Sequence, residues 1–239
     1  MAGTVAPNIV TDGLVLYVDA ANTKSYPGSG TTWSDISRGG NNGTLTNGPT
    51  YSTDGGSIVF DGVDDYVSIP NNNSLVFGNN DFTVSIWIKT PLASTGEGTP
   101  SQWGPIISKG CTTSAPSGTW WFAQTSTNSN RITFNISSNP GGTFVTATTT
   151  PTLLDGWHNI VFTRIGSTGS MYTDSTLTNT DTSSDSNLNS TTPLWIAGTS
   201  PSATKRTSMT LSQVQIYNRS LSAIEVLQNY NATKSRFGL

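Results

Sequence analysis

Three carboxylates gather within five positions, at Asp61, Asp64 and Asp65. Carboxylate oxygens are hard ligands of the kind that Ca²⁺ prefers, and two carboxylates facing each other across a cleft are what glycoside hydrolysis requires. The same residue types also form turns, because an Asp side chain hydrogen-bonds its own backbone two residues on. The cluster is therefore consistent with a metal site, a catalytic pair or a capped turn.

Residues for catalysis are scarce. The chain has two glutamates: Glu97 stands in a Gly-rich loop, and Glu225 belongs to a helix cap. The Asp61 cluster occupies a turn and does not alternate along a strand, as a glycosidase pair on a sheet would. A single histidine, His158, lies in the middle of an expected strand, and the lone Cys111 has no second ligand near it. We therefore expect no glycosidase, no Ser-His-Asp triad and no zinc site, and predict that the protein is not an enzyme.

Alternating apolar residues predict the strands that must position these groups. Two strands, around Ile58–Phe60 and Tyr66–Ile69, are expected to form a hairpin through the acidic corner. The clearest strand is Phe82–Lys89, followed by a Gly/Pro/Ser loop over residues 91–104. Further strands are expected at 14–19, 105–108, 120–124, 131–137, 144–149, 157–164, 194–198 and 211–217, with a polar hairpin region over 166–192.

One helix signal stands near the C-terminus. Ser222 and Glu225 form a capping box, in which each side chain bonds the backbone amide of the other residue. Leu221 and Val226 can form a hydrophobic staple across this first turn. We expect the helix to fade over residues 229–231, at Asn-Tyr-Asn.

Composition narrows the class of partner. Charged residues make up 10% of the 239 residues, against a usual ~25%, and the net charge is −3. No basic stripe is present, so nucleic acid is not an expected partner. No apolar run approaches the ~20 residues that span a bilayer, so no membrane association is expected. The first residues lack the charged and apolar regions of a signal peptide, which predicts that the chain is not exported if this is its natural start.

Four segments, in order, resemble the laminin-G-like (concanavalin A-like lectin/glucanase) jelly rolls. They are the WSDISRGGNNGT segment at 33–44, the FDGVDDYVSIP segment at 60–70, the GWHNIVF segment at 156–162 and the IYNRSLSAIE segment at 216–225. The resemblance implies an all-β sandwich of two antiparallel sheets with one short C-terminal helix. Residues 1–12 are then an N-terminal arm, and 13–239 are one domain.

The stretches 13–20, 42–51 and 227–238 also resemble such domains in virion proteins of tailed bacteriophages. This implies a non-enzymatic structural subunit of a virion, either a head-decoration (outer capsid) protein or a tail appendage, assembled in the host cytoplasm. Its partners would be other virion subunits, contacted through residues 1–12 and 233–239. The alternative is a carbohydrate-binding adhesion module that recognises bacterial surface polysaccharide, and host glycans are possible partners under both hypotheses.

The resemblance also implies candidate sites. A structural Ca²⁺ often pins loops at one edge of this fold, which points to Asp35, Asp61 and Asp64, with Asp19 as a second choice. Where many relatives carry I-D-E-V before the last strand, this chain has Leu-Ser-Gln-Val at 211–214, which removes two carboxylates. The alternative is that Asp61 and Asp64 only cap a hairpin turn.

Sugar binding needs exposed aromatic rings to stack on pyranose faces, beside polar groups that bond the hydroxyls. Several aromatic residues stand in or beside expected loops, and we take Trp103, Trp121 and Tyr51 as the candidates for a glycan site. For each of them, packing within the domain is the alternative explanation. Trp120 and Trp121 point to opposite faces of a strand, so at least one is expected in the core.

Overall fold

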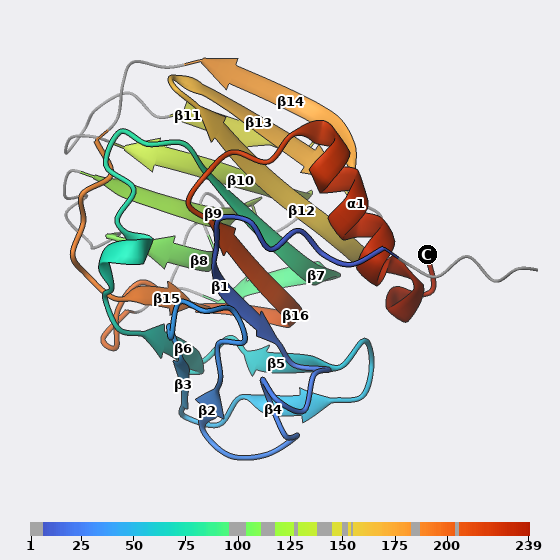
Figure 1. Ribbon diagram of the computed structural model, residues 1–239. Coiled ribbons are helices and arrows are strands. Elements are labelled where there is room, and N and C mark those ends of the chain that lie inside the picture. The colour runs from blue at the N-terminus through green and yellow to red at the C-terminus, as the bar shows by residue number, and fades with distance from the viewer. Residues whose placement is uncertain are drawn as a thin grey trace, which may run out of the picture.

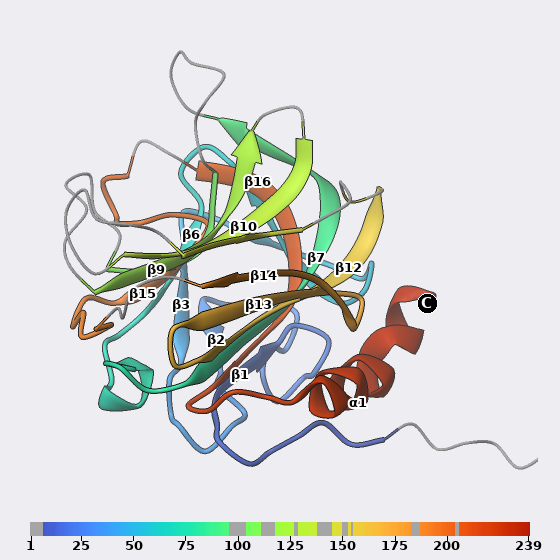
Figure 2. The same cartoon turned by 90° about the horizontal axis from the view of Figure 1, so that it is seen from above.

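The computed structural model describes residues 7–95, 104–110, 118–126, 129–137, 145–149, 153, 155–182, 187–203 and 206–239. Two antiparallel sheets face each other, and one α-helix lies outside them (Figures 1 and 2). This confirms the two-sheet jelly-roll sandwich with a short C-terminal helix that the sequence predicts.

The first sheet has the order β14 (Thr176–Thr182), β13 (Thr168–Thr173), β12 (Gly156–Ile165), β7 (Phe82–Thr95), β16 (Arg206–Tyr217), β5 (Ser57–Asp61) and β4 (Thr50–Ser52), and β1 (Leu14–Asp19) also pairs with β16. The second has the order β11 (Val145–Thr148), β10 (Ser129–Ser137), β9 (Thr119–Ser126), β8 (Gly104–Lys109), β15 (Leu194–Ile196), β6 (Tyr66–Ile69), β3 (Gly43–Thr46) and β2 (Thr32–Trp33). The helical elements are η1 (Asn73–Leu75), α1 (Ala223–Thr233) and η2 (Lys234–Phe237).

The core between the sheets is aromatic. On β7 the alternating residues Phe82, Val84, Ile86 and Ile88 are all buried, as their spacing predicts. Across the sandwich, the ring of Phe134 on β10 stacks on that of Phe162 on β12, with 3.8 Å between the centroids. Burial of these rings removes a large apolar area from water and fixes the distance between the sheets.

The acidic corner does not join a hairpin, and this part of the prediction is wrong. Strand β5 pairs with β4 and β16 in the first sheet, whereas β6 pairs with β3 and β15 in the second. Residues 61–65 therefore carry the chain from one sheet to the other. Both strands show the alternation of a half-buried strand, and alternation does not reveal which strand is the partner.

Strand β7 also differs from its prediction, since it continues to Thr95 where the composition indicates a loop from residue 91. The backbone of β7 remains paired with the start of β16 beyond a register shift, where Ser208 lies opposite Ala93 and Arg206 opposite Thr95. A partner strand can satisfy the backbone groups of a segment rich in small polar residues, which overrides its weak local preference for a strand.

Helix α1 and the N-terminal arm form a third layer on the outer face of the first sheet (Figure 1). The capping box is present as predicted, and Leu221 and Val226 lie in one buried cluster. The helix extends to Thr233 and is longer than expected. Its Asn229 side chain accepts a hydrogen bond from the Val10 amide and donates one to Tyr217 Oη. These tertiary bonds hold a poor helix former in helical conformation.

The described parts of both chain ends are held by the chain itself. The Val10 carbonyl accepts a hydrogen bond from Tyr217 Oη at 3.0 Å, and the Asn8 carbonyl accepts one from Gln228 Nε2 at 2.8 Å. In the tail, the ring of Phe237 stacks on that of Trp87, with 4.0 Å between the centroids. No helix in the described part of the chain is long and apolar enough to cross a bilayer.

Candidate functional site

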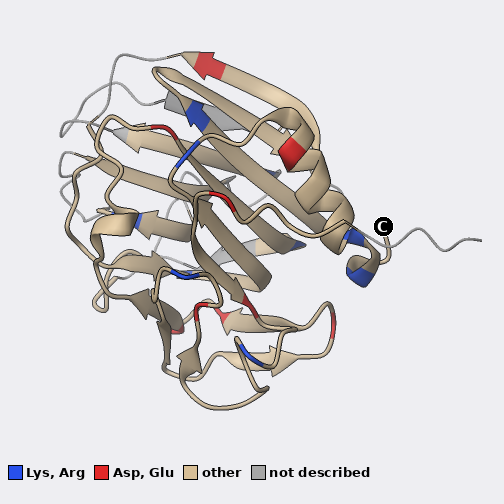
Figure 3. Cartoon of the chain, in the orientation of Figure 1, with Lys and Arg blue, Asp and Glu red and all other residues tan. Residues whose placement is uncertain are grey.

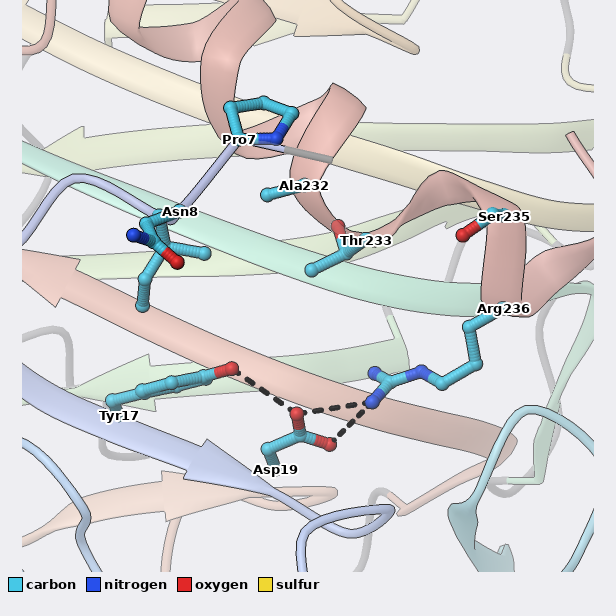
Figure 4. Close-up of a pocket in the computed structure, with 9 residues that line it drawn as sticks. Pro7, Asn8, Tyr17, Asp19, Ala232, Thr233, Ser235 and Arg236 are labelled. Atoms are coloured by element: carbon cyan, nitrogen blue, oxygen red, sulfur yellow. Dashed lines mark hydrogen bonds and ion pairs between the residues drawn. The ribbon is translucent and has the colours of Figure 1, made fainter. Parts of the chain in front are cut away.

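A hollow of about 350 Å³ lies where the two ends of the chain meet on the outer face of the first sheet (Figure 4). The arm forms one wall, β1 forms the floor, and the end of α1 with η2 forms the other wall. The residues that line it are Pro7, Asn8, Ile9, Tyr17, Asp19, Ala232, Thr233, Ser235 and Arg236. Its volume is at the lower end of the ~300–1,000 Å³ of pockets that bind small molecules.

The floor follows from the period of β1. Leu16 and Val18 point into the core, so Tyr17 and Asp19 point to the opposite face, toward the hollow. Asp19 is only 5% exposed, and both of its carboxylate oxygens accept hydrogen bonds from Arg236 Nη1, at 2.9 and 3.0 Å. Figure 4 shows this ion pair closing the base of the hollow between β1 and the C-terminal segment.

Tyr17 takes part in the same polar network. Its hydroxyl donates to Asp19 Oδ2 at 3.1 Å and accepts from Gln213 Nε2 at 2.8 Å. Burial, together with the negative charge of Asp19, raises the pKa of Tyr17 well above its usual value. The phenol therefore stays neutral at any physiological pH, and the tyrosine offers a fixed ring edge and face to the hollow.

The C-terminal wall is positioned by aromatic stacking. Trp87 on β7 lies between the rings of Tyr230 and Phe237, and its indole Nε1 donates to Thr233 Oγ1 at 2.9 Å. This stack fixes the turn from α1 into η2, which directs Arg236 back over β1. Arg236 Nη2 also donates to Ser212 Oγ at 3.1 Å, while its Nε is buried and has no partner among the described residues.

Two neutral groups of the lining remain available to a ligand. The side-chain amide of Asn8 and the hydroxyl of Ser235 have no hydrogen-bond partner among the described residues, and both residues are exposed. Beside them, Pro7, Ile9 and Ala232 contribute apolar surface. The combination of a few free polar groups with apolar surface is typical of sites that bind small polar organic ligands.

A second hollow, of about 280 Å³, lies on the other side of the arm. It is lined by Thr11, Leu14, Ile36, Ser37 and Arg38. The Arg38 guanidinium has no partner among the described residues, so this hollow carries an uncompensated positive charge, unlike the larger one.

The acidic corner brings Asp61, Asp64 and Asp65 together, with one carboxylate oxygen of each within 4.8 Å of the others. Asp61 Oδ1 accepts from the Val63 amide at 2.7 Å, which is the turn-capping bond that the sequence predicts. Asp65 Oδ2 accepts from the Asp61 amide at 3.0 Å. Burial, with the two neighbouring carboxylates adding to it, raises the pKa of Asp65 above its usual value.

Asp35 does not belong to this group. Its carboxylate accepts hydrogen bonds from the Tyr17 amide, the Asn41 amide and both the amide and hydroxyl of Ser37, at 2.8–2.9 Å. All of these bonds organise the loop between β2 and β3. The three residues predicted to share a calcium site therefore lie in two places. Asp61 and Asp64 lie in the acidic corner, where the third carboxylate is that of Asp65, and Asp35 lies in the loop between β2 and β3.

The three aromatic candidates for a glycan site are not brought together. Tyr51 stands on β4 of the first sheet, is 38% exposed, and packs against Tyr26 with 6.0 Å between ring centroids. Trp121 stands on β9 of the second sheet and is half-buried, while Trp120 is in the core, as expected for one of the pair. Trp103 lies outside the described residues.

The groups considered for catalysis have structural partners. Glu225 forms an ion pair with Arg219 at 2.6 Å and completes the helix cap, and this hydrogen bond with Arg219 lowers its pKa to about 2. His158 Nδ1 lies 2.7 Å from Asp174 Oδ2, so the histidine has a side-chain partner. Glu97 and Cys111 lie outside the described residues.

Sequence reasoning did not identify the hollow, although Asp19 was a second choice for calcium. Its residues come from positions 7–9, 17–19 and 232–236, and no local spacing connects them. One signal was present. The stretches 13–20 and 227–238 were both singled out by resemblance, and Asp19 in the first pairs with Arg236 in the second.

Comparison with known families and structures agrees with the fold. The family described as the concanavalin A-like lectin/glucanases superfamily matches residues 61–227. No curated protein matches the chain.

Solved structures match at low identity. They include the binding domain of Paraclostridial Mosquitocidal Protein 1 (TM-score 0.68, 14% identity, 92% of this chain and 52% of that one). The binding domain of Botulinum Neurotoxin DC in complex with SialylT matches with a TM-score of 0.70 at 13% identity, over 93% of this chain and 52% of that one. Trypanosoma rangeli sialidase in complex with sialic acid matches with a TM-score of 0.66 at 16% identity, over 98% and 36%. The chain thus spans about half the length of the toxin binding domains, and at these identities the likeness concerns the fold.

Proposed function

The chain belongs to the concanavalin A-like lectin/glucanases superfamily, and from this membership we propose that it is a non-enzymatic domain that binds a saccharide. The site is the hollow between the N-terminal arm, β1 and the C-terminal segment. The observation that carries the proposal is the composition of this hollow, where the free Asn8 amide and Ser235 hydroxyl lie beside apolar surface above a rigid polar floor.

The chemistry of a sugar suits this lining. A pyranose presents hydroxyls that both donate and accept hydrogen bonds, together with C–H faces that pack on apolar or aromatic side chains. An amide and a hydroxyl can each donate and accept, so they match sugar hydroxyls in either orientation. The volume of about 350 Å³ is suited to one or two sugar rings.

The structural neighbours support a binding role only by fold. Two of them are binding domains of toxins, one in complex with SialylT, and a third is a sialidase in complex with sialic acid. Because this chain covers about half of the former and about a third of the latter, their ligands are not transferred to it.

The absence of catalysis is part of the proposal. Glycoside hydrolysis requires two carboxylates free to act across a cleft. Asp19 in the hollow is tied to Arg236, and Glu225 is tied to Arg219. The exposed carboxylates Asp61 and Asp64 belong to one tight turn together with Asp65. A saccharide incubated with the protein should therefore be recovered intact by mass spectrometry.

A glycan panel containing neutral and acidic oligosaccharides tests the binding role, with titration calorimetry on each saccharide that binds. Asn8→Ala and Ser235→Ala should each weaken binding by about 5- to 10-fold, which corresponds to one lost hydrogen bond of about 1 kcal/mol. Asn79→Ala is the matched control, since Asn79 is equally exposed in the connection before β7. A panel without any binder, or binding that is unchanged in both hollow variants, would refute the proposal.

A second candidate function is a structural subunit of a bacteriophage virion that displays this domain. It is favoured by the stretches 13–20 and 227–238, which resemble virion proteins and here build one continuous surface around the Asp19–Arg236 pair. In this proposal the arm and the tail contact neighbouring virion subunits.

Electron microscopy of purified phage particles tests this second candidate. The expected result is density for the chain on the capsid or the tail, with residues 1–12 or 233–239 buried against another subunit. A protein that is monomeric by mass photometry and absent from purified particles contradicts the virion role and leaves saccharide binding untouched.

A further inference from the structure

The charges of the main hollow cancel. Its lining contains one anion, Asp19, and one cation, Arg236, and the other seven residues are uncharged. Building on the proposed saccharide site, we propose that this hollow selects neutral sugars and discriminates against sugars that carry a carboxylate, such as uronic and sialic acids.

The cation of the hollow does not offer a ligand two free donors on one edge. Arg236 Nη1 donates to both oxygens of Asp19, Nη2 donates to Ser212 Oγ, and Nε is buried away from solvent. Recognition of a carboxylate by arginine uses two parallel N–H donors on one edge of the guanidinium. In this hollow Asp19 occupies Nη1, Ser212 occupies one hydrogen of Nη2, and Nε is buried, so no edge of the guanidinium keeps two free donors for a ligand carboxylate.

An acidic sugar could form the two-donor contact with Arg236 only by displacing Asp19. Asp19 is 5% exposed, and its oxygens also accept hydrogen bonds from Tyr17 Oη and the Ala21 amide. Displacement would leave a buried carboxylate without its cation, next to the incoming negative charge of the ligand. Both effects oppose binding of an anion.

The surroundings add to this preference. The protein carries a net charge of −3, so its overall field does not attract anions. In Figure 3 the charged residues are few, and the basic segment beside the hollow is η2, which contains Lys234 and Arg236. Lys234 points its ammonium group over the ring of Tyr230, with 5.3 Å to the ring centroid, and does not line the hollow.

The groups that remain free are suited to a neutral ligand. The Asn8 amide and the Ser235 hydroxyl carry no charge, and each can donate to and accept from a sugar hydroxyl. Specificity then arises from these neutral groups together with the charge pair beneath them, which offers no uncompensated counter-charge to a ligand ion of either sign.

Matched pairs of saccharides that differ by a carboxylate test the inference on the unmodified protein. Two fixed pairs are lactose with 3′-sialyllactose and methyl glucoside with methyl glucuronide. Each saccharide that binds in the panel is also compared with the analogue that gains or lacks a carboxylate. Titration calorimetry should give at least about a 10-fold tighter Kd for the neutral member, the discrimination expected from one unfavourable charge contact.

A substitution that releases the cation sharpens the test. Asp19→Asn removes the anion and leaves Arg236 free, so the affinity for the acidic member should rise by about 10-fold or more relative to the neutral member. Asp64→Asn is the matched control, because it removes one carboxylate from the exposed corner and changes the net charge equally. If Asp19→Asn does not fold, the comparison on the unmodified protein still decides the inference.

Each outcome has a distinct meaning. Neutral members that bind more tightly, with a reversal in Asp19→Asn, support the inference. Acidic members that bind the unmodified protein as tightly as neutral ones, and still bind Arg38→Gln, overturn it while leaving saccharide binding intact. The Arg38→Gln variant removes the unpaired cation of the second hollow, so that binding there is not counted. A panel with no binder overturns the proposed function itself, together with this inference.

Discussion

The main hollow and the acidic corner are two carboxylate-bearing regions with opposite construction. The corner takes Asp61, Asp64 and Asp65 from one turn of the chain, and no basic group forms an ion pair with them in the described structure. The hollow takes Asp19 from β1 and Arg236 from the last residues, 217 positions away, and its charges cancel. The corner thus concentrates negative charge from one turn of the chain. In the hollow, a distant segment supplies the cation that compensates the charge of Asp19.

The two regions also differ in the contacts that stabilise them. The corner is held by short-range turn bonds, such as that from the Val63 amide to Asp61. The hollow depends on the packing of the third layer on the first sheet, where Trp87 of β7 fixes the tail and Asn229 of α1 fixes the arm. Substitutions in the third layer should therefore be costly for both stability and binding, and substitutions in the corner should be mild.

The largest expected effect is that of Trp87→Ala. Loss of the stack with Tyr230 and Phe237 and of the hydrogen bond to Thr233 should destabilise the fold by about 3–5 kcal/mol in urea unfolding. It should also abolish binding in the hollow, because the wall that carries Ser235 and Arg236 is released. Val63→Ala at the corner, where Val63 is 72% exposed, should stay within about 0.5 kcal/mol of the parent. Equal effects of the two variants would remove the distinction between the regions.

A smaller effect is expected for Arg236→Gln. It leaves Asp19 buried without its cation, which costs about 3–5 kcal/mol for a fully buried pair, and about 2–3 kcal/mol here because the Arg236 side chain is 26% exposed. Adding Asp19→Asn to Arg236→Gln should recover part of this loss. A double-mutant cycle measured by urea unfolding gives the coupling energy, and a value near zero would show that the ion pair does not stabilise the floor. Arg38→Gln, which breaks no described pair, is the control.

Acid should weaken the third layer, in contrast to its effect on the corner. The hydrogen bond from Arg219 lowers the pKa of Glu225 to about 2, below its usual value of 4.5. Because the pKa of Glu225 is lower in the folded state than in the unfolded state, its ionised form stabilises the fold at pH values above about 4.5. This stability is lost as the pH falls from about 4.5 toward 2. We expect a loss of about 1 kcal/mol over this window, since the pair is partly solvated. Glu225→Gln should flatten the dependence of the unfolding free energy on pH, and an unchanged slope would contradict the assignment.

The smallest effect, with the opposite sign, is expected at the corner. Burial raises the pKa of Asp65, so the folded state favours its protonated form, and the associated stability is lost as the pH rises through that pKa. Asp65→Asn should therefore stabilise the protein by about 0.5 kcal/mol at pH 7 and have no such effect at pH 3. The asparagine oxygen can still accept from the Asp61 amide. Thermal unfolding at both pH values measures the difference, and destabilisation at pH 7 would exclude like-charge strain in the corner.

The residues of each strand could be predicted from the sequence, but their partners could not. Phe82, Val84, Ile86 and Ile88 form a core face because side chains alternate along any strand, whatever its neighbours. The assignment of β5 and β6 to different sheets depends on β16 and β15, which are more than 120 residues further along the chain. The predicted hairpin failed for this reason.

The candidate site residues show the same contrast between local contacts, which the sequence predicts, and long-range contacts, which it does not. The turn bonds of Asp61 and the cap of α1 follow from side chains that reach a backbone amide two or three residues away, so their spacing in the sequence was sufficient to predict them. Asp35 was assigned to the same site as Asp61 on the basis of residue type, and its place in the loop between β2 and β3 depends on the folded chain.

The periods of the strands, the cap of α1, the acidic turn and the jelly-roll family can all be predicted from residue order, because they depend on contacts between near neighbours or on ordered motifs. Three other features arise from folding: the pairing of Asp19 with Arg236, the helical conformation of Asn229, and the hollow between the arm and the C-terminal segment. These contacts join residues that are far apart in sequence, and the packing of the third layer on the first sheet brings them within hydrogen-bonding distance.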